Sequence, residues 1–193
     1  MIMQAAVESI DLHIPQPPSE IEISYDDGSA EGGWSWGSGD EICSEDGGNR
    51  GYAIRMTTPD SEPFTVTAIK LFSRRYEEDC TTRFEIWDHD RNTLYSDVVS
   101  HSEYSTAVDS WDSATWGYKG VPNIVVSGDF YIAMYTDSTD PDDEVYPDTG
   151  VYVGYDTSFS SDRSYTVQGK TLTWDLSTLQ ETTNWMIRAV GTE

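Results

Sequence analysis

Residues 127–135 read Ser-Gly-Asp-Phe-Tyr-Ile-Ala-Met-Tyr, and this stretch decides the fold. A Ser-Gly-Asp turn signal opens it, and six residues with almost no polarity follow. Alternate side chains of a strand point to opposite faces, and both sets are apolar here: Phe130, Ile132 and Met134 on one face, Tyr131, Ala133 and Tyr135 on the other. The run is too short and too aromatic for a buried helix. We predict a central strand with one face in a core and the other in a core or beneath a loop or partner.

Short apolar or alternating segments occur along the rest of the chain, separated by turn signals. We predict strands at residues 21–25, 52–57, 64–71, 83–87, 93–95, 124–126, 151–155, 164–167, 171–174 and 184–190. The alternation changes phase within residues 64–71, which predicts a β-bulge near Ala68. The sequence has no ten-residue amphipathic helical pattern. The predicted fold is therefore all-β: a two-sheet antiparallel β-sandwich, jelly-roll-like, with about ten strands and long acidic loops.

The 193 residues suit one domain, which we place at residues 21–193. Residues 1–20 end in a Pro-Gln-Pro-Pro stretch and predict an N-terminal arm or linker. Residues 7–14 alternate loosely, so the arm could pair with a sheet edge of its own domain or of a second copy and drive self-assembly. A disordered linker is the alternative. The first residues lack the basic segment of a signal peptide, and no 18-residue apolar run predicts a membrane-spanning helix.

The charge balance is strongly acidic, with 11 Lys and Arg against 35 Asp and Glu and a formal net charge of −24. Nucleic acids and anionic membrane surfaces would be repelled, so we expect neither as a partner and no direct membrane insertion. The balance favours solubility, cation binding or a salty environment. An acidic, solvated surface is the simplest interpretation.

The two cysteines, Cys43 and Cys80, do not form a Cys-x-x-Cys pair, which argues against a zinc or thioredoxin-like site. One disulfide between them would indicate an oxidising compartment, hence an extracellular or cell-surface location. Closing that loop would stabilise the fold by about 3–4 kcal/mol. Two free buried thiols are the alternative.

A run of carboxylates between residues 137 and 148, here called the acidic segment, is the candidate metal site: Asp137, Asp140, Asp142, Asp143, Glu144 and Asp148. Ca²⁺ takes six to eight oxygen ligands, which such a segment can supply. Its spacing begins like an EF-hand loop, but Val145 occupies the position of the turn glycine. The alternative is a solvated loop without metal.

Aromatic residues are numerous, with seven tryptophans and twelve tyrosines. Four tryptophans lie in or beside predicted loops and are the candidate ligand-binding residues: Trp34, Trp36, Trp111 and Trp116. Exposed aromatic faces stack on sugar rings, and such patches mark binding surfaces. These rings could instead cap the ends of the core. The remaining three lie in predicted strands and are assigned to the core: Trp87, Trp174 and Trp185.

Catalytic motifs are missing from the sequence. His13, His89 and His101 are scattered, and neither His-Glu-x-x-His nor Gly-x-Ser-x-Gly occurs. Asp88-His89-Asp90 lies at a predicted turn, where Asp is expected for turn geometry. We therefore expect a protein that is not an enzyme.

Five short motifs occur in order: Tyr25-Asp26-Asp27-Gly28, Phe84-Glu85-Ile86-Trp87-Asp88, Gly128-Asp129-Phe130-Tyr131, Gly154-Tyr155-Asp156 with Arg163-Ser164-Tyr165, and Asn184-Trp185-Met186-Ile187-Arg188. Together they resemble the β-sandwich modules of secreted and cell-surface proteins of archaea, methanogens especially, and of some bacteria. The resemblance covers about residues 21–192; residues 37–51 and 137–148 depart from the pattern. It implies a jelly-roll-like accessory domain, often beside peptidase or other extracellular modules, with no catalytic residues to transfer.

The expected function is that of a non-catalytic extracellular module for surface adhesion, assembly or protein interaction. Its partners would be other surface proteins or glycans. The alternative is a carbohydrate-binding module with structural calcium, and a hydrolase is disfavoured.

Overall fold

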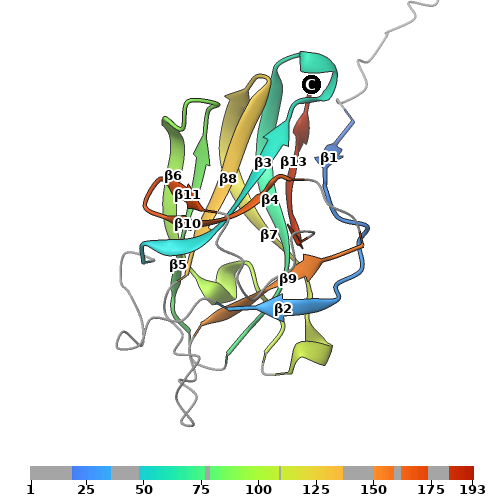
Figure 1. The fold of residues 1–193 in the computed structure, drawn as a ribbon, viewed down its shortest axis with the longest axis vertical. Helices are drawn as coiled ribbons and strands as arrows, with labels where there is room; N and C mark the ends of the chain where they lie inside the picture. Colours follow the sequence, from blue (N-terminus) through green and yellow to red (C-terminus); the bar gives the residue numbers. More distant parts are fainter. Residues whose placement is uncertain are drawn as a thin grey trace, which may run out of the picture.

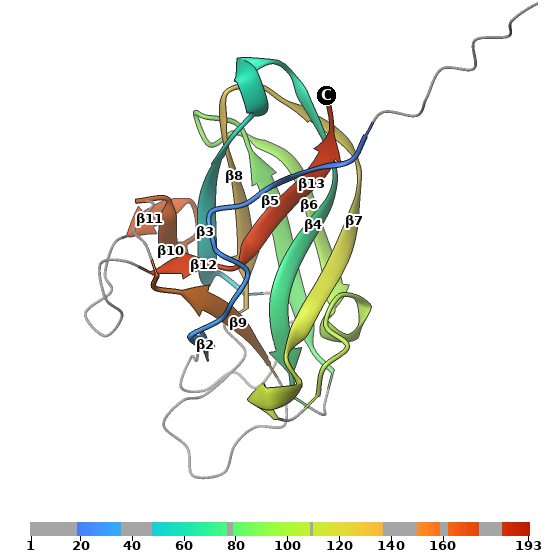
Figure 2. The ribbon, with the colours of Figure 1, turned by 90° about the vertical axis from the view of Figure 1, so that its right-hand side faces the viewer.

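The computed structural model describes residues 19–35, 48–76, 79–108, 110–136, 150–158, 162–173 and 183–193. These residues form two antiparallel β-sheets packed face to face, so the predicted β-sandwich is confirmed (Figures 1 and 2). Residues 1–18 of the predicted arm lie outside the described residues. No helix within the described ranges is long and apolar enough to cross a membrane.

The two sheets are called sheet A and sheet B. Sheet A runs in the order β1-β13-β4-β9-β12, and β7 pairs with β4 and β2 with β9. Its strands are β1 (Ile21–Ile23), β2 (Gly32–Trp34), β4 (Phe64–Arg75), β7 (Thr115–Val126), β9 (Val151–Asp156), β12 (Asn184–Trp185) and β13 (Ile187–Thr192). Sheet B runs in the order β11-β10-β3-β8-β5-β6. Its strands are β3 (Arg50–Thr57), β5 (Thr81–Trp87), β6 (Thr93–Ser100), β8 (Asp129–Tyr135), β10 (Ser164–Gln168) and β11 (Thr171–Thr173).

Three 3₁₀ helices connect strands: η1 (Pro59–Ser61), η2 (His101–Glu103) and η3 (Trp111–Ser113). The turn before β6 is built on Asp88, whose carboxylate accepts hydrogen bonds from the backbone N–H groups of Asp90 (2.9 Å) and Asn92 (2.8 Å). Asp88 is therefore a turn-forming residue, as the sequence indicated.

The stretch that decides the fold becomes β8, a central strand of sheet B between β3 and β5. Phe130, Ile132 and Met134 lie in the core between the sheets. Ala133 and Tyr135 belong to a second apolar cluster on the outer face of sheet B, with Tyr131 packed against it. Both faces of the strand are therefore covered by apolar side chains, as the pattern predicted.

The core between the sheets contains large side chains from both of them. The rings of Tyr52 and Trp185 lie 4.4 Å apart between centroids, and the indole N–H of Trp185 donates to the Tyr165 carbonyl oxygen at 2.9 Å. Trp185 is therefore a core residue, as predicted. Trp87 is also fully buried, but it belongs to the cluster on the outer face of sheet B. Trp174 lies outside the described residues.

The predicted β-bulge near Ala68 is confirmed. Pairing of β4 with β7 shifts between Val66 and Ala68, and pairing of β4 with β13 shifts at the same place. The shift explains the phase change: Val66 and Ile69 both face the core although they are three residues apart.

Several boundary predictions were wrong. β4 runs to Arg75 and β6 covers Thr93–Ser100, beyond the predicted residues 64–71 and 93–95. β7 covers Thr115–Val126 and not only residues 124–126, because β4 offers it a backbone partner along most of its length. The last strand is two strands, because Met186 changes neighbours: its N–H donates to Gly154 (2.9 Å) on β9, and its carbonyl oxygen accepts from Phe72 (3.0 Å) on β4. The alternation of apolar and polar residues predicts neither the pairing of β7 with β4 nor the hydrogen bonds of Met186 to two different strands.

Candidate functional site

The tryptophans predicted to bind a ligand do not form one cluster. Trp34 lies on β2, partly buried, and packs against the core between the sheets. Its carbonyl oxygen accepts a hydrogen bond from the Tyr52 hydroxyl at 3.0 Å, which ties β2 to sheet B. Trp34 therefore caps the core. Trp36 lies outside the described residues.

Trp111 and Trp116 do come together, on the outer face of sheet A. Both rings meet Phe72 edge to face, with centroids 5.8 Å and 5.5 Å from it. The ring of Trp111 covers Gly33, where an added Cβ would overlap the indole. Both tryptophans remain partly exposed. They form an aromatic platform supported from below by β4.

Two cations stack beside this platform. The Arg188 guanidinium lies 3.9 Å from the Trp116 ring centroid, and Lys70 Nζ lies 4.9 Å from it. Arg188 on β13 and Lys70 on β4 are cross-strand neighbours, so their side chains project together from the outer face. Cation–π contacts at partly exposed rings of this kind stabilise by about 0.5–2 kcal/mol each.

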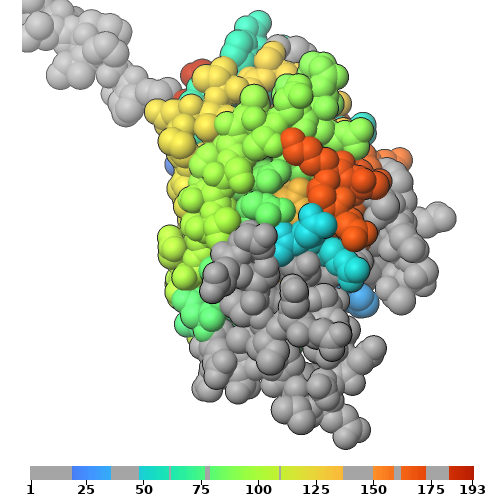
Figure 3. Space-filling model, turned by 90° about the vertical axis from the view of Figure 1, so that its left-hand side faces the viewer, coloured from blue at the N-terminus to red at the C-terminus, as the bar shows by residue number. Residues whose placement is uncertain are grey.

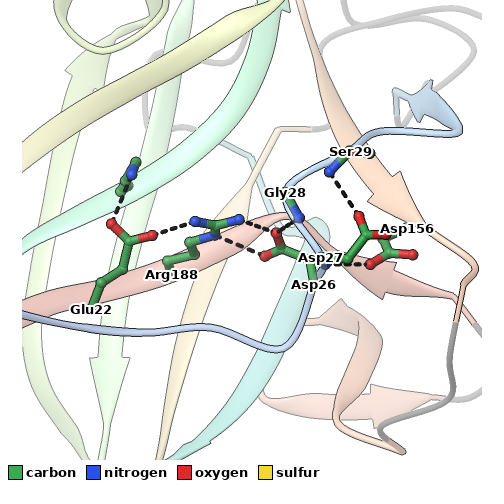
Figure 4. Close-up of polar contacts among 8 residues, drawn as sticks. Glu22, Asp26, Asp27, Gly28, Ser29, Asp156 and Arg188 are labelled. Atoms are coloured by element: carbon green, nitrogen blue, oxygen red, sulfur yellow. Dashed lines mark hydrogen bonds and ion pairs between the residues drawn. The ribbon is translucent and has the colours of Figure 1, made fainter.

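Carboxylates neutralise both cations (Figure 4). Glu22 pairs with Lys70 at 2.7 Å and also with Arg188, and Arg188 pairs with Asp26, whose side chain is fully buried. Burial raises the pKa of Glu22, but the hydrogen bonds from Lys70 and Arg188 outweigh it and hold that pKa below its ordinary value. These ion pairs fix β1 and the turn after it against β13 and β4.

The turn that follows β1 uses the remaining carboxylates. Asp26 accepts from the N–H of Gly28, and Asp156 accepts from the N–H groups of Asp27 (2.7 Å) and Ser158 (2.6 Å). Gly28 has φ +92°, a conformation that favours glycine. Among the described residues no group of three or more His, Cys, Asp or Glu side chains is arranged to hold a metal ion. The acidic segment lies outside the described residues, so its calcium site stays a prediction.

The exposed large apolar side chains of the described residues all lie on two edge strands. They are Leu94 (42% exposed) and Val98 (40%) on β6, and Tyr118 (52%) and Val125 (63%) on β7. Among the strands that the structure describes, β6 pairs only with β5, and β7 only with β4. A Lys119–Asp97 ion pair at 2.8 Å joins the two strands across the side of the sandwich. We call this side the β6–β7 edge (Figure 2).

Sequence reasoning did not find the β6–β7 edge. Strand order decides which strand is an edge, and β6 and β7 are central in the chain. The only signal was Pro122, a residue confined to edge strands and bulges, which lies within β7.

Cys80 lies just before β5, is almost fully buried and is disulfide-bonded. Cys43, its predicted partner, lies outside the described residues, so the pairing itself stays a prediction. Of the histidines, His89 is exposed beside the Asp88 turn and His101 is fully buried in η2, where its Nε2 contacts the Thr81 carbonyl oxygen at 3.1 Å. The two do not form a common site.

Comparison with known proteins supports the β-sandwich fold and nothing beyond the fold. No family model and no curated protein matches the chain. A solved structure of the clostridial cysteine protease Cwp84 after propeptide cleavage is similar, with 13% identity and a TM-score of 0.51 over 90% of this chain and 40% of that one. Another, of the cysteine protease and lectin-like domains of Cwp84, a surface layer associated protein of Clostridium difficile, gives 16% identity and a TM-score of 0.44 over 75% of this chain and 32% of that one. The chain thus spans less than half of either structure.

Proposed function

We propose that this chain is a non-catalytic extracellular β-sandwich module that mediates adhesion or assembly through protein contacts at the β6–β7 edge. One observation carries the proposal: the exposed large apolar side chains of the described residues all lie on the two edge strands of this side of the sandwich. Tyr118 and Val125 of β7 project from the outer face of sheet A, and Val98 of β6 projects from the outer face of sheet B. Apolar side chains beside unpaired backbone groups are the features that a partner strand uses.

The edge is built for a limited contact. In β7, Pro122 has no N–H to donate, and Asn123 has φ +35°, so the second half of the strand is interrupted. The regular half, before Gly120, carries Tyr118 and Lys119. A partner strand can add to this half or to β6, while the interruption limits open-ended aggregation.

Two further observations support an extracellular accessory module. Cys80 is disulfide-bonded, which favours an oxidising compartment. The fold occurs as 40% of a longer protein in the Cwp84 structure, so it can be one part of a larger chain.

Site-specific photocrosslinking tests the proposal. A photoreactive residue at Val98 or Val125, on the full chain displayed by its producing cells, should crosslink to a protein. The same residue at exposed Asp90, in the turn before β6, is the matched control. Crosslinks at Asp90 equal to those at the edge, or no protein crosslink at the edge, would contradict the proposal.

A carbohydrate-binding module with structural calcium is the second candidate, favoured by the platform that Trp111 and Trp116 form around Phe72. Retention on immobilised polysaccharides tests it. Replacing Trp116 by Ala should abolish retention, whereas Trp34→Ala should not, because Trp34 caps the core. Retention that survives Trp116→Ala would remove this candidate.

A further inference from the structure

The outer face of sheet B carries a row of side chains, here called the Tyr131 row, that runs across four neighbouring strands. Arg55 on β3 is the register partner of Tyr131 on β8, which is the partner of Trp87 on β5. Arg163, just before β10, extends the row, since its carbonyl oxygen accepts from the Arg55 N–H at 2.8 Å. Strands lie about 4.8 Å apart, so the row spans roughly 14 Å.

Three cations on or beside this face, Arg55, Arg163 and Lys170, have no carboxylate partner within the described part of the chain. Arg83 of β5 lies on the same face and does have one, Glu85 at 3.3 Å. Arg55 forms no ion pair, and its Nε is buried without a hydrogen-bond partner. Arg163 donates to the Thr57 hydroxyl at 2.8 Å and stacks on Tyr25. Lys170 donates to the Arg91 carbonyl oxygen and to the Thr93 hydroxyl.

This arrangement differs from that of Lys70, Lys119 and Arg188 on sheet A, which each pair with a carboxylate. On the same sheet Arg74 stacks on the Tyr76 and Tyr152 rings instead. The arrangement on sheet B is unexpected in a chain of net charge −24, because acids outnumber cations about threefold. The carboxylates of the sheet B face are engaged elsewhere: Glu85 with Arg83 and the Trp87 indole N–H, and Asp129 with the Thr57 hydroxyl. Within the described part of the chain, the positive charges of Arg55 and Arg163 are therefore not neutralised by a carboxylate.

Aromatic side chains flank Tyr131 in the row, and two of them, Trp87 and Tyr165, are themselves buried (0% and 7% exposed). Tyr131 is partly exposed and lies between Trp87 and Tyr165, with ring centroids 6.1 Å and 6.3 Å away. Ala53 and Ala133, paired across β3 and β8, are fully buried in the apolar cluster that includes Val167 of β10. In Figure 3, atoms of β8 are seen between those of β5 and those of the β10–β11 hairpin. Lys170 of that hairpin lies over the Trp87 ring, 5.8 Å from its centroid.

We propose that the Tyr131 row binds an acidic polysaccharide of the uronate type. The Tyr131 ring takes the apolar face of a sugar, and Arg55 and Arg163 bind the carboxylates of neighbouring sugars. An acidic peptide fits less well. β3 and β8 are flanked by strands on both sides, so a peptide would gain none of the main-chain hydrogen bonds available at an edge. This site is separate from the β6–β7 edge and from the Trp116 platform.

Calorimetric titration of the full chain with an oligogalacturonate tests the proposal. EDTA is present at fixed ionic strength, so that calcium does not bridge protein and glycan. Binding should be seen with the acid oligomer and lost with its methyl ester, which has the same rings without the charge. Arg55→Gln should weaken binding about tenfold or more, since hydrogen bonds to charged groups are the strong ones.

The control variant is Lys119→Gln, which removes the same charge from the edge of sheet A and should leave affinity unchanged. The Arg55 side chain makes no hydrogen bond in the described structure, so its variant should fold, and a melting curve checks this. No binding, equal affinity for the methyl ester, equal affinity of Arg55→Gln, or equally tight binding of poly-glutamate would each overturn the proposal.

Discussion

Acidification should destabilise this protein through one histidine. His101 is fully buried in η2, and burial, the largest influence on it, lowers its pKa from 6.5 to about 4. The Thr81 carbonyl oxygen and the Asp79 carboxylate raise that pKa, while Arg75 lowers it, and burial prevails. The imidazole is therefore neutral in the folded protein between pH 6.5 and 4, where the unfolded chain takes up a proton.

The pKa difference between the folded and unfolded states sets both the direction and the size of the change in the free energy of unfolding with pH. Because the unfolded state binds the extra proton, the free energy of unfolding falls as pH drops below 6.5. One pKa unit corresponds to about 1.4 kcal/mol, so the full loss is about 3 kcal/mol, reached near pH 4, and by pH 5 it is about 2 kcal/mol. Carboxylates with lowered pKa, such as Asp79 and Asp97, act in the same direction only at lower pH, below about 4.

Urea denaturation at pH 7.5, 6.5, 5.5 and 5.0 measures the effect, with His101→Gln as the comparison. Glutamine does not titrate, and its amide can still donate to the Thr81 carbonyl oxygen. Subtracting the pH dependence of the variant removes the contribution of the 35 acids and leaves that of His101. Parallel pH profiles for the two proteins would refute the reasoning.

Four other results are expected. Arg188→Met should lower the free energy of unfolding by about 3–5 kcal/mol in urea denaturation, because a buried carboxylate loses its partner; a loss below 1 kcal/mol would contradict this. Gly51→Ala should unfold the protein, since a Cβ there overlaps the backbone of β8, while Gly120→Ala should be neutral; equal melting temperatures would be the contrary outcome. Alkylation and mass spectrometry of the unreduced protein should find no free thiol at Cys43 or Cys80. Calcium added after EDTA should raise the melting temperature beyond any change that NaCl alone produces. At a hundredfold excess of calcium over Kd, the free energy of unfolding should rise by about 2.7 kcal/mol.

Patterns within one segment predicted the features that depend on one strand. β8 was predicted because both of its faces are apolar, and the bulge at Ala68 because alternation changed phase there. β7 was mostly missed because its outward positions are polar or exposed, and backbone pairing with β4 is what makes it a strand. Met186 interrupts the last strand for the same kind of reason, since it serves two neighbours.

The surfaces were harder to predict than the strands. Trp111 and Trp116 were selected as loop residues, but their convergence on Phe72 depends on β4 and β7 lying side by side. Arg55, Tyr131 and Trp87 are far apart in the chain and become one row only when the register of three strands is known. The sequence pattern of a single segment does not predict how these three strands are paired.

Surface retention of edge variants tests the central proposal most directly. The double variant Val98→Lys and Val125→Lys places charges on the exposed apolar positions of β6 and β7. The control carries the same two charges at exposed polar positions away from the edge, Ser24→Lys after β1 and Thr171→Lys on β11. If the β6–β7 edge holds the protein to its partner, the double edge variant should be lost from the surface of its producing cells into the medium while the control is retained. Equal retention of the two proteins would contradict a contact at this edge.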